Sequence, residues 1–138
     1  MNRQTFRVLS VLLIFVAEGG CGSEPRLVKV TGRLMYRGAP VPATDVKFIP
    51  DDGGRPSHGG TNQDGQFTLK YTRKEPGVTT GKHTVVLTYD AAAEEGLPAS
   101  ERPSRELKTV IAGYATPEKS DLHYEVTGDG QFIEIEIK

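Results

Sequence analysis

From residue 27 onward, apolar and polar side chains alternate in short segments with a period of two. In the first segment Val28, Val30 and Leu34 share one side, and the residues between them are mostly polar. A period of two is typical of a β-strand that buries one face. Six further segments of this kind follow, separated by turn signals such as Asp64-Gly65. The pattern therefore predicts seven short strands.

Strands of this length at regular spacing, with almost no helical period, predict an all-β fold. We expect one domain, a seven-stranded antiparallel sandwich of the immunoglobulin-like or prealbumin-like kind. The residues expected to form its core are those on the inward faces of the strands: Val28, Val30, Leu34, Val46, Phe48, Phe67, Leu69, Val85, Leu87, Leu122, Val126, Ile133 and Ile135.

The segment from residue 90 to about residue 116 interrupts this pattern. It is polar in its first two thirds and contains Pro98 and Pro103. We interpret it as an excursion from the sandwich, with one helical turn near Ser104 to Leu107. A connection of this length is uncommon inside a compact fold.

The first twenty residues have the order of a secretory signal peptide. Arg3 and Arg7 form a basic start, and the apolar run from Val8 to Ala17 follows. A run of ten apolar residues is too short to cross a bilayer, which needs about 20. The alternative, a hydrophobic first strand, fits less well beside the two arginines.

The single cysteine, Cys21, stands where such a signal would be cut. The segment Glu18-Gly19-Gly20-Cys21 resembles the lipobox of bacterial lipoproteins, although an aliphatic residue is usual at the position of Glu18. The resemblance implies cleavage before Cys21 and a diacylglycerol on its thiol. A free cysteine is the alternative. The predicted organisation is a lipoprotein signal peptide at 1–20, a tether at 21–26 and the strand-rich domain at 27–138.

Composition narrows the function further. The chain has 17 Lys and Arg against 18 Asp and Glu, a formal charge of −1. No basic excess is present to release counterions from nucleic acid, so we expect no nucleic-acid partner. With one cysteine, an intrachain disulfide cannot form.

Four elements along the chain carry a second resemblance. They are the opening Val30-Thr31-Gly32-Arg33-Leu34 with the turn Arg37 to Val41, the strand Val46 to Pro50, the turn Thr61 to Phe67 around Asp64-Gly65, and the strand Gly81 to Val85, in which His83 takes the usual place of a tyrosine. In this order they resemble carboxypeptidase regulatory-like domains, also described as transthyretin-like. The family implies a prealbumin-like or immunoglobulin-like sandwich and no catalytic residues. The tail from Tyr114 to Lys138 is similar to small bacterial lipoproteins built on this domain.

The residues themselves predict no catalytic, cofactor or metal site. His58, His83 and His123 show no metal-ligand spacing. His83 is expected at the edge of the core in place of an aromatic, while His123 is expected to face solvent. Ser57-His58 is the nearest approach to a catalytic pair, but neighbours on an extended chain point apart. Asp51-Asp52 favours a turn over a calcium loop. Asn62 is the single asparagine after residue 21, and its surroundings favour a turn over an isopeptide bond.

We therefore expect a non-enzymatic lipoprotein of the cell envelope with Cys21 as its lipid attachment site, held at a membrane through that anchor. The other partner is an envelope protein or a glycan. The alternative function is a glycan- or peptide-binding surface domain. Most Tyr and Phe residues, Tyr71 among them, fall on inward faces, which makes Tyr114 the best exposed aromatic for a sugar.

Overall fold

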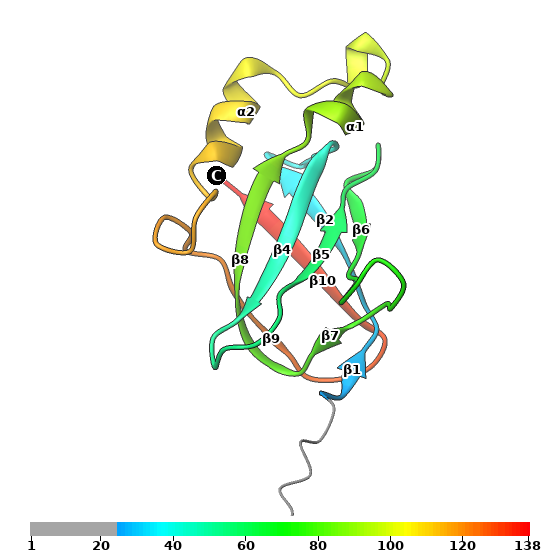
Figure 1. Cartoon of the computed structure of the whole chain (residues 1–138). Helices are drawn as coiled ribbons and strands as arrows, with labels where there is room; N and C mark the ends of the chain where they lie inside the picture. The colour runs from blue at the N-terminus through cyan, green and yellow to red at the C-terminus, as the bar shows by residue number, and fades with distance from the viewer. Residues whose placement is uncertain (1–24) are drawn as a thin grey trace, which may run out of the picture.

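The computed structural model describes residues 25–138. The predicted signal peptide 1–20, Cys21 and the first part of the tether lie outside the described residues. The described chain enters beside β1 (Leu27–Val28), which pairs with β7 (Val78–Thr79) at one end of the molecule. The helices lie at the opposite end (Figure 1).

Two four-stranded sheets form the body of the protein, which confirms the predicted all-β sandwich. The first sheet has the order β10, β2, β3, with β6 also paired to β2: β2 (Val30–Tyr36), β3 (Ala39–Pro40), β6 (Gln66–Thr68) and β10 (Gln131–Ile137). The second has the order β5, β4, β8, β9: β4 (Thr44–Pro50), β5 (Ser57–Gly60), β8 (Gly81–Tyr89) and β9 (His123–Val126).

One strand pair departs from the antiparallel arrangement that we predicted. β10 lies parallel to β2 over seven registered pairs, from Gln131 beside Val30 to Ile137 beside Tyr36. β10 follows β9, which lies in the other sheet, so the chain passes from one sheet to the other over residues 127–130 before β10 pairs with β2. All the other pairs between named strands are antiparallel.

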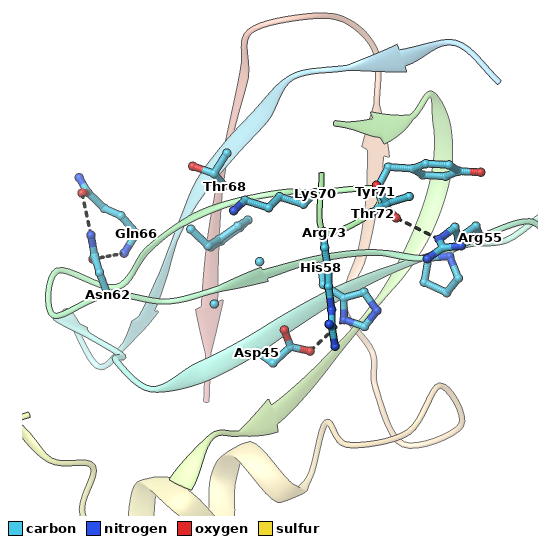
Figure 2. Close-up of a pocket in the computed structure, with 14 residues that line it drawn as sticks. Asp45, Arg55, His58, Asn62, Gln66, Thr68, Lys70, Tyr71, Thr72 and Arg73 are labelled. Carbon is cyan, nitrogen blue, oxygen red and sulfur yellow. Dashed lines mark hydrogen bonds and ion pairs between the residues drawn. The ribbon is translucent and has the colours of Figure 1, made fainter. Parts of the chain in front are cut away.

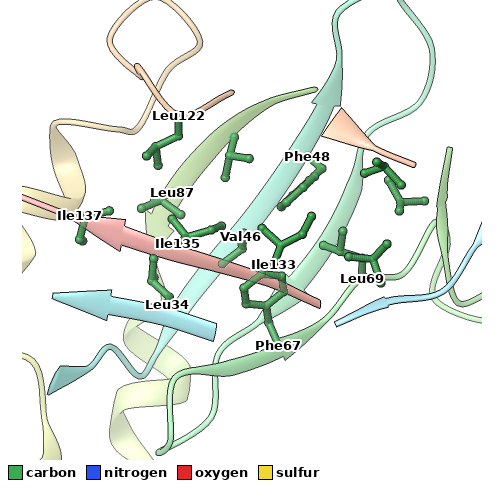
Figure 3. Close-up of a cluster of buried hydrophobic side chains, with 14 of the residues drawn as sticks. Leu34, Val46, Phe48, Phe67, Leu69, Leu87, Leu122, Ile133, Ile135 and Ile137 are labelled. Carbon is green, nitrogen blue, oxygen red and sulfur yellow. The ribbon is translucent and has the colours of Figure 1, made fainter. Parts of the chain in front are cut away.

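The core lies between the two sheets (Figure 3). Every residue that the alternation predicts for the core is buried there. Four more buried residues, Val41, Val78, Ile111 and Ile137, complete the cluster. The side chains of the two inner faces meet as in other two-layer β folds.

The excursion after β8 contains more helix than the sequence indicates. It holds α1 (Ala91–Glu95), a 3₁₀ turn (Ala99–Glu101) and α2 (Arg105–Ala112). The Ser104 hydroxyl accepts from the Leu107 amide and so caps α2 at its start. The predicted single turn extends to Ala112 because Leu107, Val110 and Ile111 are spaced to form one apolar stripe against the core.

His83 is fully buried in the core, deeper than the core-edge position expected from the tyrosine place that it occupies. It is 0% exposed, and its ring centroid lies 5.8 Å from that of Phe48. Nδ1 lies 3.0 Å from the Gly81 carbonyl oxygen, so this nitrogen carries a proton and donates. Burial lowers the pKa of His83 below its ordinary value, because the charged imidazolium loses its hydration.

This burial predicts a pH-dependent stability. The unfolded chain takes up the His83 proton near pH 6.5, whereas the folded protein resists it. The stabilisation is therefore complete above about pH 6.5 and is lost as the pH falls through the folded pKa. Urea midpoints at pH 5 and pH 7.5 should differ less in His83→Phe than in the native protein. His123→Gln, which changes an exposed histidine, should keep the native difference between the two urea midpoints. If the midpoint fell equally from pH 7.5 to pH 5 in all three proteins, His83 would not be the source of the pH dependence.

Candidate functional site

A groove of about 970 Å³ opens where an edge strand of one sheet meets an edge strand of the other. Fourteen residues line it, drawn from β4, β5, β6 and the loops that flank β5 and β6 (Figure 2). A second hollow, beside Arg55 and Thr79, has a volume of about 320 Å³.

The local sequence explains why the two edges come so close. The His58 amide donates to the Lys70 carbonyl at 2.9 Å, and the Lys70 amide donates to the His58 carbonyl at 2.8 Å. Next to this pair, Gly59 faces Thr68, and a Cβ atom on Gly59 would lie 2.7 Å from the Thr68 carbonyl oxygen. Glycine at position 59 therefore permits the contact that joins β5 to the chain after β6.

Strand alternation decides which side chains face the groove. Ser57 and Gly59 are buried, while His58 and Gly60 are exposed. On the other wall Thr68 and Lys70 are exposed on either side of buried Leu69. Thr68 and Lys70 follow one another along this wall in Figure 2. The groove is thus lined by polar side chains that point outward from the two strand edges.

Three permanent cations, Arg55, Lys70 and Arg73, line the groove against one carboxylate, Asp45. Within residues 25–138, none of the three cations has a carboxylate oxygen within 4.0 Å. The Asp45 carboxylate is itself engaged, since its Oδ2 lies 3.1 Å from His58 Nδ1. Three cations against one carboxylate give this part of the surface a net positive charge.

An aromatic ring stands at one end of the groove. Tyr71 is half-buried, and the Arg55 guanidinium carbon lies 5.7 Å from its ring centroid. Arg55 Nε also donates to the Tyr71 carbonyl at 3.0 Å, which holds the arginine beside the ring. A guanidinium over an aromatic ring is favoured by the ring quadrupole.

Two amides stand at the other end. Asn62 Oδ1 accepts from the amides of Asp64 and Gln66, both at 3.0 Å, and so shapes the predicted Asp64-Gly65 turn. Gly65 adopts φ +71°, which suits glycine. Asn62 Nδ2 lies 3.5 Å from Gln66 Oε1 at the rim of the groove. Asn62 is therefore a turn residue, as predicted.

The structure separates the residues that came nearest to a catalytic set. Ser57 is 1% exposed and faces away from the groove, while His58 faces it, so the two point apart as expected. His58 pairs with Asp45, but no hydroxyl of the described residues makes a hydrogen bond to its ring. The pair therefore lacks the hydroxyl nucleophile bonded to the histidine that a serine-type catalytic site requires.

The prediction for the exposed aromatic was wrong. Tyr114 is half-buried and packs against the core, and its hydroxyl oxygen accepts from the Lys138 amide at 3.3 Å. Tyr71, which the alternation places inward, lines the groove instead. The alternation fails there because β6 ends at Thr68 and the chain turns at Tyr71 to Glu75.

The other singled-out residues have ordinary surroundings. His123 is exposed, as predicted, and its Nδ1 lies 3.3 Å from the Thr84 hydroxyl. That hydroxyl donates to Asp51 Oδ1 at 2.8 Å, in the turn expected at Asp51-Asp52.

In residues 25–138 no three His, Cys, Asp or Glu side chains gather as a metal site would require. Across the same residues, none of the helices has the length and apolar character needed to cross a bilayer.

Sequence reasoning missed Arg55, Lys70, Arg73 and Tyr71 as a group. They are dispersed over 19 positions and come together only through the backbone pair between His58 and Lys70. The sequence feature that could have indicated this basic group is the excess of basic over acidic residues between positions 55 and 74.

No family model and no curated protein matches the chain. The solved structures that resemble it include two DUF3823 family proteins. The protein from Bacteroides ovatus has 18% sequence identity and a TM-score of 0.44, over 81% of this chain and 44% of that one. The protein from Parabacteroides merdae has 13% identity and a TM-score of 0.47, over 83% of this chain and 47% of that one. The chain thus spans less than half the length of either protein.

Proposed function

We propose that this chain is a non-enzymatic, lipid-anchored β-sandwich module of the bacterial cell envelope, which binds its partner in the groove between β5 and β6. The observation that carries the binding role is the set of three cations without carboxylate partners in an open groove. Cations without carboxylate partners on a concave surface favour the binding of an anionic ligand.

The resemblance to carboxypeptidase regulatory-like domains supports the non-enzymatic part of the proposal. In that family the sandwich accompanies an enzyme and performs no chemistry. The one histidine–carboxylate pair of the groove, His58 with Asp45, agrees with this assignment because Ser57 turns into the core. We assign His58 and Asp45 to the shape and charge of the groove.

The leader and the lipobox-like segment support the anchor on Cys21. Two or more acyl chains hold a protein stably at a membrane, whereas a single chain does so only marginally. The tether of residues 21–26 reaches at most about 20 Å. The end of the sandwich with β1 and β7 then lies toward the bilayer, and α1 and α2 lie away from it (Figure 1). In a host with two membranes, Gly22 after the cysteine favours the outer one.

The anchor predicts a clear change in localisation. Cys21→Ala should move the protein from the membrane fraction to the soluble exported fraction, because the acylated thiol is lost. The core of the described domain is formed by residues from Val28 onward, so circular dichroism of the released protein should keep its strand-rich spectrum. Ser23→Ala, two residues away in the same tether, should leave the protein in the membrane. Unchanged attachment of Cys21→Ala would contradict the lipid anchor.

A further inference from the structure

We propose that the groove binds an acidic polysaccharide, a chain of sugars that bear carboxylates. This inference rests on the proposed function, since it names the class of ligand for the same groove. It starts from the three cations Arg55, Lys70 and Arg73, which have no carboxylate partner within the described residues. An arginine presents a planar fork that matches a carboxylate, and a lysine adds a point charge.

The neutral groups of the groove favour a sugar over a simple anion. Gln66 and Thr68 offer amide and hydroxyl groups that can both donate and accept, as sugar hydroxyls require, and Asn62 Nδ2 adds a donor. Tyr71 offers an apolar ring face with a polar tip. Figure 2 shows the amides at one end of the groove and Tyr71 with Arg55 at the other. A ligand that uses both ends must be extended.

The backbone of the groove disfavours an acidic peptide bound as an added strand. Strand addition needs a free edge with unpaired amide and carbonyl groups. At β5 the amide and the carbonyl of His58 are both taken by Lys70, at 2.9 and 2.8 Å. The middle of this edge is therefore closed to a further strand, and the ligand meets side chains only. Among extended anions, this favours a polysaccharide.

The test measures binding of the native protein, purified from membranes in detergent, to three polymers. Polygalacturonate carries carboxylates on sugars, dextran is a neutral polysaccharide, and poly-L-glutamate carries carboxylates on a peptide. We expect saturable binding to polygalacturonate that weakens with added salt, no binding to dextran, and binding to polyglutamate about tenfold weaker or less. Equal affinity for the two polyanions, or no affinity for polygalacturonate, would overturn the proposal.

Matched variants place the binding in the groove. Lys70→Gln with Arg73→Gln removes two positive charges from the groove and should weaken polygalacturonate binding about tenfold or more. Arg105→Gln with Lys119→Gln removes two exposed charges elsewhere and should change it less than about twofold. Tyr71→Ala should weaken binding to polygalacturonate while leaving the weak binding to polyglutamate unchanged. Equal losses in the two double variants would contradict a site in the groove.

A parallel assay separates the ligand class from the binding role. Isolated cell envelopes of the source organism are sedimented with the native protein and with the two double variants. If the groove variant alone loses envelope binding while polygalacturonate does not bind, the polysaccharide is wrong and the binding module stands. If binding to envelopes and binding to polygalacturonate are both unaffected by the changes at Lys70 and Arg73, both proposals fail.

Discussion

Phe48→Ala is expected to lower the free energy of unfolding by about 3–5 kcal/mol, because it opens a cavity that the core cannot refill. Phe48 is 0% exposed and lies in the core between the two sheets (Figure 3). Its ring centroid is 6.4 Å from those of Phe67 and Tyr124 and 5.8 Å from that of His83. A domain of this size has a total stability of about 5–15 kcal/mol, so the loss is a large part of it.

Phe132→Ala is the matched control for this prediction. Phe132 is 56% exposed on β10, and its truncation should change the free energy of unfolding by less than about 0.5 kcal/mol. Urea unfolding of the two variants and the native protein measures both effects. Similar losses for Phe48→Ala and Phe132→Ala would mean that the packing between the two sheets is not as described.

Gly32→Ala is expected to cost about 3 kcal/mol through overpacking. Gly32 lies in β2, between β10 and β6. A Cβ atom there would come far inside van der Waals contact with the Phe67 ring and with the carbonyl oxygen of Ile133. The ring is packed in the core and the oxygen belongs to the backbone of β10, so neither can move away cheaply.

Gly128→Ala provides the comparison for Gly32→Ala. A Cβ atom at position 128 meets nothing within 4 Å, so the change should stay within about 1 kcal/mol. Thermal and urea unfolding report both variants. A stable Gly32→Ala protein would show that β10 and β6 do not flank β2 as closely as described. The same crowding gives a physical reason for the glycine in the opening motif Val30 to Leu34.

The period of two predicted seven strands and most of the core, whereas residues 25–138 hold eight strands in the two main sheets and the short pair β1 and β7. It correctly placed residues as far apart as Val28 and Ile135 on inward faces, and it placed Ser57 and His58 on opposite faces. It could not predict that β10 pairs with β2, because alternation says which face is buried and not which strand is the neighbour. The parallel pairing was missed for that reason.

Other features depend on contacts that a local pattern does not contain. The length of α2 follows from the fit of Ile111 against the core, and the polar residues around it concealed this stripe. The positions of Tyr71 and Tyr114 were misjudged because each lies where a regular element has ended. The groove itself exists only because β5 and the chain after β6 meet at His58 and Lys70.

The mass of the amino-terminal peptide, taken from mature protein of its native cells, tests the lipid anchor most directly. If this envelope module is held by acyl chains, the peptide begins at Cys21 and carries the added mass of a diacylglycerol on its thiol. A peptide that still contains residues 1–20, or a Cys21 without lipid, would contradict the account.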